Sequence, residues 1–315
     1  MKKTIIASAI AAAVAAPAAF ADVKISGMVA YEQSTLDDAG VSTDAGNVYT
    51  DLVFTGSEDL GNGLKAGFKY HIYHDNGGAT VDTSSSNTSA AADQVADTTV
   101  SLSGDFGTII AGRMESLAES KMDAFANIEG GNLLDLEAES SAFSSRVNNA
   151  VAYVSPDFNG FHAAVSTFQG SDNAMNACNE VLGVYSNAGL KVMANSSQCR
   201  QAATGDLEHQ GIAVSYNMGD VTFYVMDTEY DVSAASDNKD YTMYGVKYAM
   251  GNNTIAVGMN DDQGKGTSGA EETLVSLTHN FSKNVSVVAQ WSNTDYNTAS
   301  EKEDDTYLVG MRVNF

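Results

Sequence analysis

The sequence predicts an all-β fold, a sixteen-stranded antiparallel transmembrane β-barrel, and three observations lead to this prediction. Apolar and polar side chains alternate at period two in short stretches along the chain, which is typical of strands with one apolar face. The connections between these stretches are alternately tight turns and longer, acidic segments rich in Ser, Thr and Asn. Beyond residue 21 the chain has one proline, Pro156, in a turn, as unbroken strand pairing requires.

Residues 1–21 have the pattern of a cleaved secretory signal peptide. Lys2 and Lys3 precede an apolar run, and Ala19-Phe20-Ala21 has the small-x-small form of a cleavage site. The apolar run is too short to span a membrane as a helix, and no later stretch is long enough. We therefore expect two parts, the signal peptide (1–21) and the barrel (22–315). Loss of the two lysines changes the formal charge from −24 to −26.

The last strand shows the alternation most clearly, because Tyr307, Val309 and Met311 are separated by Leu308 and Gly310. The same reading gives sixteen strands near residues 22–33, 47–57, 63–74, 97–105, 107–113, 146–156, 160–168, 179–187, 190–198, 209–218, 220–229, 240–250, 252–260, 272–281, 284–294 and 305–315. An even strand number, short turns at one end and long polar loops at the other are typical of an outer-membrane barrel. In lipid such a sheet closes so that no backbone edge stays unpaired. A soluble sandwich or repeat protein could use the same alternation, but the segregation of long loops to one end favours the barrel.

One connection, residues 114–145, is unusually long and acidic. It carries seven carboxylates, from Glu115 to Glu139, against the single base Lys121, and Arg113 and Arg146 flank it. Loops of this length inside a compact domain are usually functional or disordered. We expect this third extracellular loop to fold inward, so that its carboxylates face the flanking arginines. Residues 114–126 have a composition that favours a short helix.

The strongly negative charge argues against nucleic-acid binding, because phosphates would be repelled. It suits a surface that meets small cations, or divalent ions that bridge anionic lipid. The five histidines have no metal-binding spacing, no serine stands out as an activated nucleophile, and no catalytic motif is present. We therefore expect no enzyme activity, no metal and no cofactor.

The two cysteines are expected to form a disulfide. Two strands meet at Ala188-Gly189, so Asn187 should pair with Leu190. Counting outward in this register sets Cys178 directly opposite Cys199, a separation that suits a disulfide. The alternatives are two free thiols, or a metal-binding pair that lacks other ligands.

The chain resembles the general porins of the Gram-negative outer membrane over its whole mature length. The resemblance lies in Asp105-Phe106-Gly107 and Gly112-Arg113 before the long loop, in residues 146–161 after it, in the turn at residues 58–65, and in the terminal Phe315. It implies a passive, water-filled channel for small hydrophilic solutes and ions, usually a homotrimer, with both termini periplasmic. It further implies contact with outer-membrane lipid and lipopolysaccharide, and insertion by the barrel assembly machinery with Phe315 as the signal.

The resemblance also implies a pore constriction in which acidic loop residues face basic wall residues. Arg113 and Arg146 match the wall positions, and the loop candidates are Glu115, Glu119, Asp123 and Glu129. Alternation adds further bases to the lumen wall, namely Lys24, Lys65, Lys69, Lys247 and Arg312. Rings of charge of this kind govern permeation. The excess of loop acids predicts a preference for cations, which the wall bases could offset.

Three other functions remain open at this point. A channel selective for a sugar or oligosaccharide would show a row of aromatic side chains in the lumen, and Tyr73, Phe168 and Tyr224 are scattered. A surface adhesin or receptor would act through its long outer loops. A barrel-embedded lipase would need a reactive serine.

Overall fold

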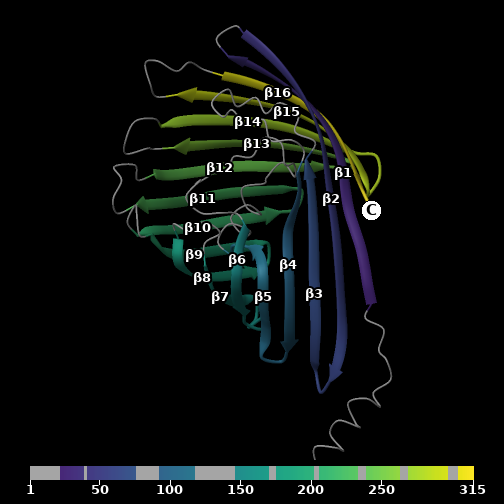
Figure 1. Cartoon of the computed structure of the whole chain (residues 1–315). Helices are drawn as coiled ribbons and strands as arrows, with labels where there is room; N and C mark the ends of the chain where they lie inside the picture. Colours follow the sequence, from purple (N-terminus) through teal and green to yellow (C-terminus); the bar gives the residue numbers. More distant parts are fainter. Residues whose placement is uncertain are drawn as a thin grey trace, which may run out of the picture.

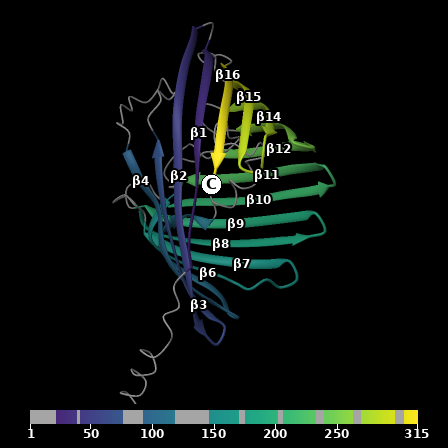
Figure 2. The same ribbon diagram turned by 90° about the vertical axis from the view of Figure 1, so that its right-hand side faces the viewer.

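The computed structural model describes residues 22–38, 41–75, 92–117, 146–169, 175–201, 206–232, 239–262, 269–296 and 304–315. These residues form a single closed antiparallel barrel in which each strand pairs with its neighbours in the chain and β1 pairs with β16. The strands are β1 (Asp22–Asp38), β2 (Val41–Gly61), β3 (Leu64–Asp75), β4 (Ala92–Gly104), β5 (Gly107–Glu115), β6 (Arg146–Val154), β7 (Phe161–Gln169), β8 (Met175–Asn187), β9 (Leu190–Gln201), β10 (Leu207–Met218), β11 (Val221–Val232), β12 (Lys239–Met250), β13 (Asn253–Asp262), β14 (Ala270–Asn280), β15 (Val285–Tyr296) and β16 (Asp304–Asn314). Figures 1 and 2 show them running slantwise around the wall, with β16 beside β1.

All sixteen predicted strands are present, which confirms the predicted fold class. The largest differences in bounds are in β1, β2 and β4. The first two extend well past the predicted 22–33 and 47–57, and β4 begins at Ala92, five residues before the predicted 97–105. The prediction followed the apolar stripe, which ends near Tyr31 and resumes near Tyr49. Backbone pairing continues beyond that stripe, because ladder hydrogen bonds need no apolar face.

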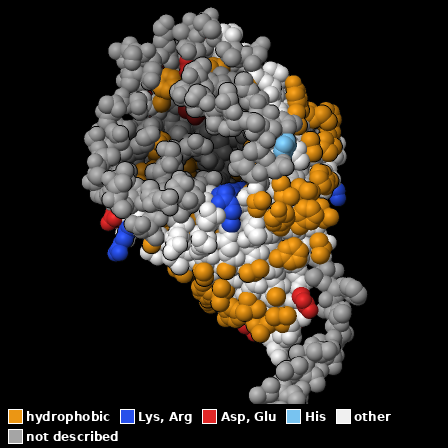
Figure 3. All heavy atoms as spheres, in the orientation of Figure 1, with side chains coloured by type: hydrophobic (Ala, Val, Ile, Leu, Met, Phe, Trp, Pro, Cys, Tyr) orange, Lys and Arg blue, Asp and Glu red, His pale blue; other side chains and the backbone are white. Residues whose placement is uncertain are grey.

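The side chains divide between the two faces of the wall as the alternation predicts. Large apolar residues such as Val100, Val225 and Val309 are more than half exposed on the outer face. Figure 3 shows hydrophobic side chains gathered over this outer wall and a hollow that opens into the barrel. The intervening positions, such as Glu32 and Gln290, point inward and are buried. An apolar exterior around a largely polar interior is the arrangement that a barrel needs in lipid.

The described short connections have the turn chemistry that their sequences suggest. Ala188 and Gly189 link β8 to β9 with φ of 47° and 88°, and two positive φ values are the type I′ combination that suits a two-residue hairpin. This turn sets Asn187 opposite Leu190, and the register then continues along both strands to Cys178 opposite Cys199. Within the described residues, no helix is long and apolar enough to cross a membrane.

The register is irregular at three of the four strand pairings from β3 to β7, with β4–β5 the regular one. Ala96 is an extra residue between β3 and β4, because His71 pairs with Asp97 while Ile72 pairs with Val95. The β5–β6 and β6–β7 pairings shift near Gly112 and Asn148. Bulges bend a strand and re-aim its side chains, so this part of the wall is locally reshaped where charged residues gather.

The chain ends at the seam that closes the barrel. Phe315 and Gly27 exchange two backbone hydrogen bonds, each with an N···O distance of 3.0 Å. Gly27 has little space around it, since an added Cβ would meet the Phe315 ring and the main chain of Asp51. The role of Phe315 as an assembly signal stays a prediction.

Candidate pore lining

A cluster of charged side chains lines the inner wall from β2 to β6, around the carboxylate of Asp97. One Asp97 oxygen, Oδ2, lies 2.5 Å from Lys69 Nζ and 3.5 Å from His71 Nδ1, and the other, Oδ1, lies 3.3 Å from Arg146 Nε. The Asp97 side chain is only 5% exposed, so these three side chains replace most of its water. Burying a carboxylate is costly unless charges and hydrogen bonds compensate for the lost water. The cluster is therefore a coupled unit in which each charge depends on its neighbours.

Two more carboxylates extend the cluster along the wall. Glu115, the last residue of β5, pairs in register with Arg146 and receives its guanidinium in an ion pair. On the other side, His71 Nε2 lies 2.7 Å from Asp51 Oδ1. The result is a row of acidic and basic side chains that alternate from Asp51 through His71, Asp97 and Arg146 to Glu115.

Among the residues predicted for the constriction, the structure brings Arg146 and Glu115 together. Arg113 is held differently, because its Nε donates to the carbonyl oxygen of Val95 at 2.9 Å and its Nη1 to Oδ1 of Asn148 at 2.8 Å. In β5 the backbone of Arg113 is the register partner of Thr98 in β4, and the Thr98 side chain is exposed. Three further predicted residues, Glu119, Asp123 and Glu129, lie outside the described residues, as does most of the predicted helix at 114–126. The constriction role of all six residues stays a prediction.

The predicted wall bases occupy inward-facing positions close to the short-turn end of the barrel. Lys24 and Lys65 are exposed near the starts of β1 and β3, and Lys69 follows Lys65 on the same face of β3. Lys247 places its Nζ 5.5 Å from the ring centre of Tyr224. Arg312 is about nine-tenths buried, with its Nη2 3.8 Å from Oε1 of Glu32. The wall thus carries both exposed bases and bases paired with acids.

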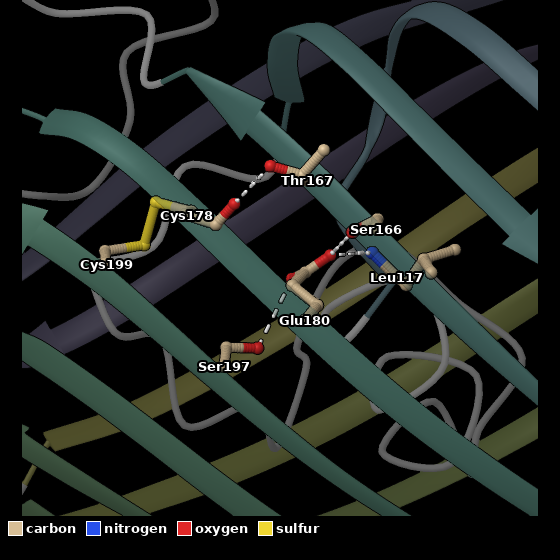
Figure 4. Close-up of a disulfide and its surroundings, with 7 residues drawn as sticks. All are labelled: Leu117, Ser166, Thr167, Cys178, Glu180, Ser197 and Cys199. Carbon is tan, nitrogen blue, oxygen red and sulfur yellow. Dashed lines mark hydrogen bonds between the residues drawn. A yellow bond between two sulfur atoms is a disulfide. The ribbon is translucent and has the colours of Figure 1, made fainter.

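The two cysteines form the predicted disulfide between β8 and β9, with a Cα–Cα distance of 4.1 Å. Both are buried on the inner face of the wall. In Figure 4 the bridge lies beside Glu180, a residue that sequence reasoning did not single out. Glu180 faces Ser197 across the next inward-facing pair of the same two strands.

Sequence reasoning also missed Asp97 and Asp51. Both stand at polar positions of alternating strands, so parity alone places them inside the barrel. Their partners depend on cross-strand register, and the extra residue Ala96 sets that register for Asp97. Within the described residues, no group of three or more His, Cys, Asp or Glu side chains forms a metal site.

Comparison with known proteins identifies the family of this chain. The sequence profile described as Gram-negative porin matches residues 7–310. Outer membrane porin protein 32 of Delftia acidovorans is 27% identical over 99% of this chain and 96% of its own length. Major outer membrane protein P.IB of Neisseria gonorrhoeae is 30% identical over 81% of this chain and 76% of its own length.

Solved structures share the fold at lower sequence identity. An anion-selective porin from Comamonas acidovorans superposes with a TM-score of 0.77 at 20% identity, over 94% of this chain and all of that one. Salmonella typhi OmpF gives 0.76 at 15% identity, over 93% and 97%. The trimer form of Vibrio cholerae OmpT gives 0.68 at 14% identity, over 94% and 99%.

The barrel and these relatives make the protein a multi-pass β-barrel of the Gram-negative outer membrane, and a channel rather than an enzyme. The chain belongs to the Gram-negative porin family.

Proposed function

We propose that this porin is a general diffusion channel for small hydrophilic solutes and ions, with its constriction between residues 114–145 and the charged wall. The observation that carries the proposal is the cluster around Asp97, which places fixed charges of both signs on the inner wall. Ordered charges on a pore wall favour solutes that exchange hydrogen bonds with water and reject apolar ones. The constriction involves Arg113, Arg146 and Glu115 from the described wall, and Glu119, Asp123 and Glu129 from the loop.

The start of the loop supports an inward course. Leu117 lies two residues beyond the end of β5, yet its backbone N donates to Oε2 of Glu180 on β8, at 2.9 Å. The strands β6 and β7 lie between β5 and β8 in the wall. The chain therefore leaves β5 across the inner face of the barrel, and Ser116 and Leu117 are buried there.

For ion selectivity we propose a preference for cations. Residues 114–145 carry seven carboxylates against one lysine. In the described wall, Arg146 is already neutralised by Asp97 and Glu115. The six loop carboxylates beyond Glu115 would then dominate the field in the narrowest part of the bore and attract cations.

Anion preference is the second candidate, and two observations favour it. One structural relative is an anion-selective porin. In addition, Lys24, Lys65 and Lys247 are inward-facing bases with no carboxylate within ion-pair distance among the described residues. Both candidates keep the diffusion channel and differ only in the sign of the selectivity.

We propose further that the channel assembles as a homotrimer, as the trimer form of OmpT does. Its outer wall would contact membrane lipid and lipopolysaccharide, and the barrel assembly machinery would insert it after removal of residues 1–21. Chemical crosslinking of the purified protein followed by light scattering tests the trimer. A monomer that conducts fully would overturn it.

The deciding experiment is conductance in a planar bilayer under a salt gradient, with heat-unfolded protein as the control. Large ohmic steps are expected, with a reversal potential whose sign corresponds to cation flow. Steps with the opposite sign would assign the selectivity to the wall bases. A correctly folded barrel that gives no steps would refute the channel, and the adhesin would then be tested by deletion of its outer loops.

A further inference from the structure

A buried carboxylate on the inner wall, Glu180 in β8, accepts three hydrogen bonds. Its Oε2 accepts from the Ser166 hydroxyl at 2.6 Å and from the Leu117 backbone N at 2.9 Å, and its Oε1 accepts from the Ser197 hydroxyl at 3.4 Å. Glu180 is only 2% exposed. Figure 4 shows its side chain between these donors, which come from three different parts of the chain.

The surroundings of Glu180 explain why the third donor matters. Its inward-facing neighbours on the wall include Leu182 and Phe168, both buried and apolar. A carboxylate removed from water needs donors for both oxygens, or its burial is strongly unfavourable. The wall itself supplies two serine hydroxyls. The backbone amide of Leu117 adds a donor from outside these strands.

Leu117 is held at its side chain as well as at its backbone. The side chain belongs to the buried apolar cluster of the inner wall, together with Met114 and Phe168. The hydrogen bond from the Leu117 amide to Glu180 fixes the orientation of the backbone at Leu117, because a hydrogen bond is directional and apolar packing is not. The two contacts together fix where the chain lies as it begins the loop.

The disulfide supports the position of Glu180. Cys178 lies two residues before Glu180 in β8, and Cys199 lies two residues after Ser197 in β9. The next strand is joined as well, because the Thr167 hydroxyl of β7 donates to the Cys178 carbonyl oxygen at 3.2 Å. Three adjacent strands are thus tied together beside the carboxylate (Figure 4).

We propose that Glu180 is a positioning residue that anchors the start of the constriction loop to β8, and that the disulfide-bonded β8–β9 pair is the platform for this anchor. The inference rests on the proposed channel function, because the anchor is expected to keep the open-channel current steady. Without the carboxylate, Leu117 keeps its apolar contacts but loses the hydrogen bond that fixes the direction of its backbone.

The test combines two measurements on full-length protein refolded into lipid. Hydrogen exchange of the peptide that contains Leu117 reports the anchor directly, and single-channel recording reports open-channel current noise. In Glu180→Ala the Leu117 amide is expected to exchange about tenfold faster or more, since a hydrogen bond to a charged group is lost. The amides of β8 and β9 should keep their protection, and the open-channel current should become noisier.

Two variants sharpen the result. Ser197→Ala is the matched control, because it removes only the 3.4 Å contact on the other oxygen and should leave Leu117 exchange unchanged. Glu180→Gln keeps an acceptor of the same shape without the charge, and should fall between the wild type and Glu180→Ala. It provides both measurements even if the alanine variant fails to fold.

Unchanged Leu117 exchange in folded Glu180→Ala or Glu180→Gln would overturn the anchor. Faster exchange with an unaltered current would show that the contact exists but does not position the pore, which also overturns the proposal. Failure of the channel function is separate, because it would appear as the absence of conductance steps in the wild type.

Discussion

The charged cluster makes a strong prediction for Asp97→Asn, a change that removes one charge with almost no change in shape. At 3.3 Å and an effective dielectric constant of about 20, the attraction between Arg146 Nε and Asp97 Oδ1 is about 5 kcal/mol before desolvation. The Lys69 side chain is 45% exposed, so water screens its attraction to Asp97, and we assign little stabilisation to that ion pair. Removing one partner of a buried ion pair typically costs about 3 kcal/mol or more, and we expect a loss of about 3 kcal/mol in unfolding free energy.

The assay is a urea titration in phospholipid vesicles, followed by the fluorescence of Trp291, the one tryptophan of the chain. Asp227→Asn is the matched control, because Asp227 is exposed in β11 and, among the described residues, accepts one side-chain hydrogen bond, from the Thr242 hydroxyl at 3.0 Å. The control should change stability by less than about 0.5 kcal/mol. Asp97→Asn should also shift the reversal potential toward anions, since Arg146 loses a counter-charge in the bore. Equal stabilities for the two variants would refute the coupled cluster.

Three other perturbations test separate parts of the barrel. Replacing Cys178 and Cys199 together by alanine should lower the unfolding free energy by about 3 kcal/mol, as expected for a bridge that closes a loop of this length, and urea titration of oxidised and reduced wild type provides the comparison. Gly27→Ala should cost about 1–3 kcal/mol, because the new methyl group would collide with a main-chain oxygen of β2 and with the terminal phenyl ring; an unchanged midpoint would show that the seam can adjust. The double variant Lys24→Gln and Lys65→Gln should shift the reversal potential toward cations. The shift should be largest at about 0.01 M salt, where the screening length is about 30 Å. No shift at this salt concentration would show that these lysines do not line the conducting path.

The sequence predicted those features of the barrel that depend on local chemistry. The pairing of Cys178 with Cys199 followed from a two-residue turn, because such a turn fixes the register of both strands that leave it. The cluster around Asp97 could not be found in this way. Its partners lie on other strands, and Ala96 shifts the register by one residue where nothing in the local sequence announces a bulge.

The loop anchor was hidden for a different reason. Glu180 stands in an ordinary alternating strand, and its partner Leu117 is distant in sequence. Alternation states which face a side chain occupies, but it carries no information about what approaches that face from another part of the chain. The full lengths of β1 and β2 were underestimated because hydrophobicity marks the lipid-facing band and not the end of backbone pairing.

The seam between β1 and β16 has a consequence for how this chain folds. Every other pair of neighbouring strands is adjacent in sequence, whereas this seam joins Met28 to Asn314. Local hairpins can form early at a small entropic cost, but this last contact must wait until the whole chain exists and its two ends meet. Until then the growing sheet presents two unpaired edges, which are templates for pairing with other chains. A nascent molecule therefore remains vulnerable to aggregation until β16 pairs with β1.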